Sequence, residues 1–133
     1  MKKAILAVLA VFVSWEVLDF IIHNLILSNT YAATAHLWRP MEEMKMGLMV
    51  LVVFLSAIFF VWIYYKLIPK SLKNGFTYGL LFGMATGISM GYGTYSVQPI
   101  PYILAFGWFL GGLVESTIAG LLVGLIIKEE TSE

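Results

Sequence analysis

The sequence predicts an all-α fold: a single integral membrane domain, residues 1–133, built as a bundle of four transmembrane helices with both termini in the cytoplasm. Hydrophobic residues make up 60% of the chain and charged residues only 12%, whereas soluble domains carry about 25% charged residues. Four apolar stretches are also long enough to cross hydrocarbon, which takes about 20 residues per helix. We expect helices because backbone groups in lipid must be paired internally and no barrel-like alternation is present.

The predicted spans cover residues 4–27, 46–65, 76–95 and 102–127. The first span begins like a signal peptide, but its apolar run exceeds a signal core of about 7–15 residues, so we expect an uncleaved helix. Residues 28–30 are expected to end this helix or to cap a short helix at the membrane surface that contains residues 32–38. Pro40 is expected to open the second helix, because proline suits a first helical turn.

The positive charges are distributed unequally between the two sides of this four-span arrangement. Arg39 and Lys45 fall on one side, and the other side holds Lys2, Lys3, Lys66, Lys70, Lys73 and Lys128. Lysine and arginine concentrate on the cytoplasmic side of membrane proteins. The distribution therefore predicts cytoplasmic termini and a multi-pass protein of the cell (inner) membrane.

Small residues recur at four-residue spacing in the third and fourth spans. Residues four apart share a helix face, and small side chains let helix backbones approach closely. The pattern indicates packing of these two spans on each other, contact between copies in a homo-oligomer, or a pore lined by backbone. The glycines concerned are Gly75, Gly79, Gly83, Gly87 and Gly91, followed by Gly107, Gly111, Gly112, Gly120 and Gly124.

Four ionisable side chains lie inside the predicted spans: Glu16, Asp19 and His23 in the first and Glu115 in the fourth. A charge at the bilayer centre costs about 2.5–3.5 kcal/mol on insertion scales, so such residues are paired, hydrated, neutralised or functional. The three in the first span fall within an arc of about 60° on an ideal helix. Glu115 reaches a depth similar to that of Glu16, because the two helices run in opposite directions.

These four residues are the candidate proton or cation site. Two close carboxyl groups, Glu16 and Glu115, are expected to share a proton, with Asp19 extending the site and His23 exchanging protons with the outside. The alternative is a neutral hydrogen-bonded network that only joins the two helices. Hydroxyl groups expected to support the site are those of Ser56, Thr86, Ser89 and Tyr92.

A metal site is a weaker prediction, and no other cofactor is predicted. One helix supplies at most three oxygen and nitrogen ligands, and the chain has no cysteine. A second group of candidates combines thioethers, which suit Cu(I), with an imidazole. This group consists of Met41, Met44, Met46, Met49 and His36. No nucleophile elbow, P-loop, dinucleotide or zinc-protease motif is present, so an enzyme is not the expected class.

The second half of the chain resembles uncharacterised bacterial families of small four-span membrane proteins. The resemblance rests on GLLFGMATGISMGYGTYSV at residues 79–97 and FGWFLGGLVESTIAG at residues 106–120, with Trp15 and Asp19 adding to it. Residues 96–98 read Ser-Val-Gln, where one such family has an Asp-Leu-Thr-Asn run. The resemblance implies the four-span fold and no activity. Small multidrug transporters share only the layout of four spans with a glutamate in the first.

The expected function is proton- or cation-coupled transport of a small solute or ion. The alternatives are a non-catalytic accessory or assembly subunit of a membrane complex, and a metal- or cofactor-binding membrane protein. The expected partners are the lipid bilayer and either further copies of the chain or another membrane protein. Nucleic acid is not expected, because the net charge is zero and the lysines form no nucleic-acid-like patch.

Overall fold

The computed structural model describes residues 1–128, and every regular element within them is helical. This confirms the all-α prediction. In chain order the elements are α1 (Lys2–Asp19), the π-helix η1 (Phe20–Ile26), α2 (Ser28–Ala33), the 3₁₀ turns η2 (Ala35–Leu37) and η3 (Met41–Glu43), α3 (Met46–Leu67), α4 (Leu72–Gly87), the π-helix η4 (Ile88–Gly93), α5 (Thr94–Val97) and α6 (Tyr102–Ile126).

Among the described residues, three helices are long and apolar enough to cross a membrane: Lys2–Ile26, which joins α1 to η1, then α3 and α6. They coincide with the predicted spans at residues 4–27, 46–65 and 102–127. The predicted span at residues 76–95 lies in α4, η4 and α5, which follow one another without a break. Length and composition of the three helices indicate a membrane protein.

The connection between the first two long helices differs from the prediction in one respect. Pro40 precedes the short turn η3, and α3 begins only at Met46. The two are separate because Met44 is extended, with φ of −67° and ψ of 129°, and interrupts the helical backbone. A short helix, α2, does follow the first span, but residues 28–30 lie within it and do not cap it, since its N-cap is Leu27. It ends at Ala33, and residues 35–37 form the separate turn η2.

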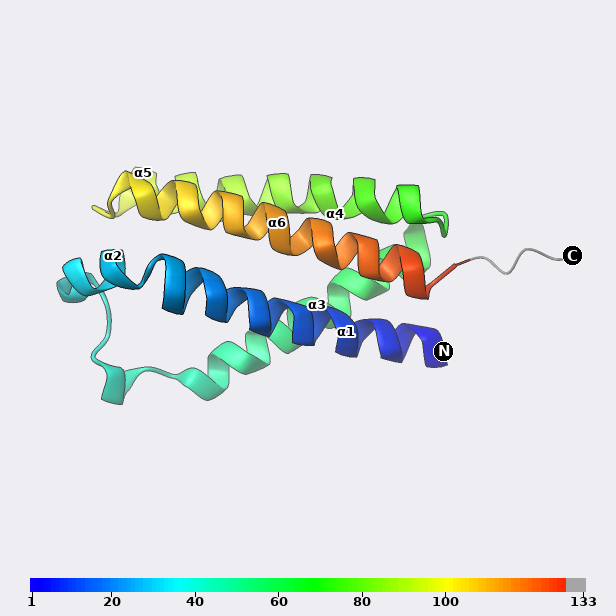
Figure 1. The fold of residues 1–133 in the computed structure, drawn as a ribbon, viewed down its shortest axis with the longest axis horizontal. Helices are drawn as coiled ribbons and strands as arrows, with labels where there is room; N and C mark the ends of the chain where they lie inside the picture. The colour runs from blue at the N-terminus through cyan, green and yellow to red at the C-terminus, as the bar shows by residue number, and fades with distance from the viewer. Residues whose placement is uncertain (129–133) are drawn as a thin grey trace, which may run out of the picture.

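The long helices form a bundle in which α4 and α6 lie side by side and antiparallel (Figure 1). Helix α1 packs on α6, and α3 packs on α1 and crosses the bundle at an angle. The start of α1, the α3–α4 connection and the end of α6 lie at one end of the bundle (Figure 1). The short helices α2 and α5 lie at the opposite end, so the lysine-rich segments are gathered at one end.

Glycine allows the close approach of α4 to α6. A Cβ atom placed on Gly79 would collide with the carbonyl oxygen of Ser116 and lie 2.9 Å from the Cα of Gly120. The same applies at Gly75, against the Gly120 carbonyl, and at Gly91, against the Ala105 carbonyl. Backbone therefore meets backbone along most of this interface, which is the packing that small residues at four-residue spacing permit.

Two separate apolar clusters fill the interior. The larger lies toward the lysine-rich end and includes Trp15, Phe60, Tyr64 and Ala119. The smaller lies toward the opposite end and consists of Leu27, Ile100, Leu104 and Ala105 with their neighbours. The Tyr64 hydroxyl also closes the α3–α4 connection, donating to the Ser71 carbonyl and accepting from the Ser71 amide, both at 3.0 Å.

Candidate functional site

The polar residues lie between the two apolar clusters. In α1 and η1, Glu16, Asp19 and His23 fall between Trp15, in one cluster, and Leu27, in the other. In the antiparallel helix α6, Glu115 falls between Ala105 and Ala119, which belong to the same two clusters. The fold therefore places all four ionisable side chains in one polar region of the bundle.

Two contacts join Glu115 to the first helix. The Trp15 indole Nε1 donates to the main-chain carbonyl of Glu115 at 3.1 Å. The side chains of Glu115 and Asp19 lie within interaction distance of each other. Two carboxyl groups at such a distance can share a hydrogen bond only with one proton between them, because an ionised carboxylate only accepts. Asp19 is thus the partner of Glu115, whereas the sequence indicated Glu16.

Glu16 is half-buried and makes no hydrogen bond within residues 1–128. Its Oε1 and the Oε1 of Glu115 are the two buried side-chain oxygens without a partner in the described part of the chain. A buried polar group left unpaired costs about 1–3 kcal/mol. These two buried oxygens, one on each helix, are groups that a proton or a cation would satisfy.

His23 connects the carboxyl groups to an aromatic cluster. Its Nε2 lies 3.5 Å from Asp19 Oδ1, and its Nδ1 lies 2.6 Å from the Tyr31 hydroxyl. The Trp108 indole Nε1 donates to the same hydroxyl at 2.6 Å. An interaction chain therefore runs from Glu115 through Asp19, His23 and Tyr31 to Trp108.

The direction of these hydrogen bonds follows from the donors. An indole N–H can only donate, so Tyr31 accepts from Trp108 and has its own hydrogen left for His23 Nδ1. In the neutral imidazole the ring proton is then on Nε2, facing Asp19. Burial, the largest effect, raises the pKa of Tyr31 above its usual 10.0; the Trp108 hydrogen bond opposes this, and the Asp19 charge adds to it. Tyr31 therefore remains a phenol at neutral pH.

The backbone around His23 is a π-helix, and Leu27 N donates to Ile22 O at 2.9 Å with the five-residue spacing of that helix type. Two glycines of α6 face it. A Cβ on Gly111 would lie 3.1 Å from Ile22 Cδ1, and a Cβ on Gly107 would lie 3.1 Å from Leu27 Cδ1. Single turns of π-helix are frequent at functional sites. Here the π-helix carries His23 beside α6 and Tyr31.

The four supporting hydroxyl residues lie outside this interaction chain. Ser56, Thr86 and Ser89 are exposed on the surface of the chain, and Thr86 Oγ1 donates to the Phe82 carbonyl at 2.8 Å. The Tyr92 hydroxyl lies 3.1 Å from that of Tyr102.

The remaining glycines of the two small-residue rows also contact neighbouring helices. A Cβ on Gly83 would lie 2.9 Å from Leu113 Cα, and one on Gly124 would lie 3.0 Å from Leu72 Cα. Gly87 and Gly112 are further members of the interface between α6 and the α4–η4 helix. The rows therefore form contacts within one chain.

Within residues 1–128, no group of three or more histidine, aspartate or glutamate side chains is arranged to hold a metal ion. Of the thioether candidates, Met41 belongs to η3, whereas Met46 and Met49 belong to α3, and all three are exposed. Met44 lies in the extended segment between these elements. His36 is exposed in η2.

Three residues of the site were not among the predicted site residues: Trp15, Tyr31 and Trp108. Trp108 precedes Glu115 by seven residues, two helical turns, and so shares its face. That spacing is a signal that the sequence contains. Tyr31 has no comparable signal, because it reaches His23 only after the chain turns at Leu27.

Comparison with protein-family models, curated proteins and solved structures finds no match to this chain. The resemblance to uncharacterised four-span families therefore stays a prediction.

Proposed function

We propose that this chain is a four-span protein of the cell membrane that moves protons or small cations through the site formed by Glu16, Asp19, His23 and Glu115. The observation that carries the proposal is the pair of buried carboxyl oxygens without partners, on Glu16 and Glu115, beside the chain Asp19–His23–Tyr31. Buried carboxyl groups next to a histidine are the chemistry of proton relays and cation sites.

The fourth span in this proposal is the succession of α4, η4 and α5. It lies along α6, a helix long and apolar enough to cross a membrane. The gathering of lysines at the end that holds Lys2, Lys70 and Lys128 supports placing that end in the cytoplasm. His23 and Tyr31 then lie toward the outer surface, with Glu16 and Glu115 deeper.

The test is proton or cation flux into lipid vesicles that contain the purified protein and a pH-sensitive or cation-sensitive dye. A potassium gradient with valinomycin supplies the driving voltage. We expect Glu16→Gln and Glu115→Gln to lower the flux to the level of empty vesicles, because an amide cannot release a proton. The matched control is Glu42→Gln in η3, an exposed glutamate outside the site. Unchanged flux in both site variants would refute the proposal.

A second candidate is a non-catalytic accessory subunit in which these residues only join helices. The Trp15–Glu115 hydrogen bond favours it, because that bond links α1 to α6 without involving a carboxyl group. This candidate predicts that the unchanged protein produces no flux in the vesicles. The same two glutamine variants would instead lower the stability of the protein or its association with a partner.

A further inference from the structure

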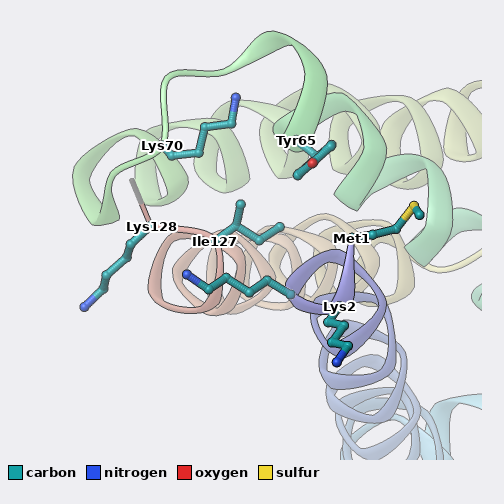
Figure 2. A pocket seen from close by; sticks show the side chains of 7 residues that line it. Met1, Lys2, Tyr65, Lys70, Ile127 and Lys128 are labelled. Carbon is teal, nitrogen blue, oxygen red and sulfur yellow. The ribbon is translucent and has the colours of Figure 1, made fainter. Parts of the chain in front are cut away.

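A second polar region lies at the lysine-rich end of the bundle, far along the helices from the carboxyl site. An open cavity of about 620 Å³ is formed there by the start of α1, the end of α3 with the following connection, and the residues after α6 (Figure 2). Four lysines line it: Lys2, Lys3, Lys70 and Lys128. None of the described residues that line it is acidic.

The rest of the lining is apolar or aromatic. Ile127 is almost fully buried, at 4% exposure, and Tyr65 is partly covered. The ammonium groups of Lys66 and Lys70 lie 5.7 Å and 5.9 Å from the centre of the Tyr65 ring, within cation–π distance. The cavity thus combines an apolar base with a rim of positive charge.

The arrangement of the lysines indicates the size of the group that fits. In Figure 2 the side chains of Lys2, Lys70 and Lys128 stand around the cavity and extend in different directions. They do not converge on one point, as the ligands of a single small ion would. A larger group that carries negative charge and several oxygen atoms matches this spread.

The position of the cavity favours a lipid as the source of that group. It lies at the ends of three helices that are long and apolar enough to cross a membrane. Apolar side chains next to it along the helices, Ile5, Leu6 and Leu67, are at least half exposed. Basic pockets at the cytoplasmic ends of membrane helices bind anionic lipid headgroups. We propose that this cavity binds the phosphate-bearing headgroup of an anionic phospholipid.

The experiment is native mass spectrometry of the full chain in detergent, titrated with phosphatidylglycerol or with phosphatidylcholine of the same acyl chains. We expect the anionic lipid to bind on the order of tenfold more tightly. Lys70→Gln combined with Lys128→Gln should remove most of that preference. The matched control is Arg39→Gln combined with Lys45→Gln, which removes the same charge at the opposite end and should keep the preference.

Three results would overturn the proposal. The first is equal binding of the two lipids, and the second is an equal loss in the control variant. The third is displacement of the lipid by inorganic phosphate at similar concentration, since this would assign the cavity to a soluble anion. The exposed Lys128 and partly exposed Lys70 are surface residues, and circular dichroism should show unchanged helix content in both double variants. Failure of this proposal leaves the proton or cation proposal intact, because the two use different residues.

Discussion

The backbone contact between α4 and α6 leads to a quantitative prediction for Gly79→Ala. The added methyl group would collide with the Ser116 carbonyl oxygen and approach the Cα of Gly120 to 2.9 Å. Both atoms belong to the backbone, so no side-chain rotation relieves the collision and the helices must separate. Overpacking of this kind costs about 1–3 kcal/mol. We expect the upper end of that range, because separation also loosens dispersion contacts along the whole interface.

Two other glycines provide matched comparisons. Gly47, in the first turn of α3, has no atom within 4 Å of an added Cβ, so Gly47→Ala should be neutral or stabilising by up to about 1 kcal/mol through helix propensity. Gly111 is intermediate, since its added Cβ would meet only the flexible end of Ile22 at 3.1 Å. The predicted order of stability is therefore Gly47→Ala, then Gly111→Ala, then Gly79→Ala.

The assay is reversible unfolding in mixed micelles with increasing sodium dodecyl sulfate, followed by far-ultraviolet circular dichroism and tryptophan fluorescence. The free energy of unfolding of each variant is compared with that of the unchanged protein. A Gly79→Ala variant as stable as Gly47→Ala would refute the close packing of α4 on α6. Contact between copies of the chain would then be the better explanation of the glycine rows.

Two tyrosines give the remaining predictions. Tyr64→Phe should lower the free energy of unfolding by about 1–3 kcal/mol, because it leaves the Ser71 amide and carbonyl without that partner. Tyr65→Phe is the control, and an equal effect of this variant would contradict the role given to the Tyr64 hydroxyl. Tyr31 has a raised pKa in the folded chain, so its contribution to stability is complete below pH 10.0 and is lost as the pH rises above that value. The decline in stability above pH 10 should therefore be smaller in Tyr31→Phe, and an unchanged decline in the same micelle assay would show that Tyr31 titrates normally.

The long helices could be predicted from the sequence because a single physical quantity, the thickness of hydrocarbon, sets the length of an apolar run. The second span was expected at residues 46–65 and α3 covers Met46–Leu67. The fourth was expected at residues 102–127 and α6 covers Tyr102–Ile126. The two π-helices could not be predicted in this way. The first packs Ile22 and Leu27 against glycines of another helix, and no local sequence pattern contains that information.

The four ionisable residues of the candidate site could be named from the sequence, whereas their pairing and the aromatic residues beside them could not. The sequence places Glu16 and Asp19 about 60° apart on one helix, and that difference is too small to decide which of them meets a residue on α6. The structure pairs Asp19 with Glu115, and the Trp15 indole lies on the same side of α1. Tyr31 and Trp108 complete the site through contacts between residues 8 and 77 positions apart.

Trp108 fixes the direction of the hydrogen bond at its end of the interaction chain. Because its indole can only donate, Tyr31 must keep an acceptor site for it, and the Tyr31 hydrogen points to His23 as long as His23 is neutral. A proton added to His23 Nδ1 reverses that bond, so the hydroxyl must turn each time the imidazole changes its charge. Tyr31 itself does not ionise near neutral pH, because burial raises its pKa. In a proton-transfer role, Tyr31 would therefore report the charge of His23 through the orientation of its hydroxyl, while the proton itself would be held by His23, Asp19 and Glu115.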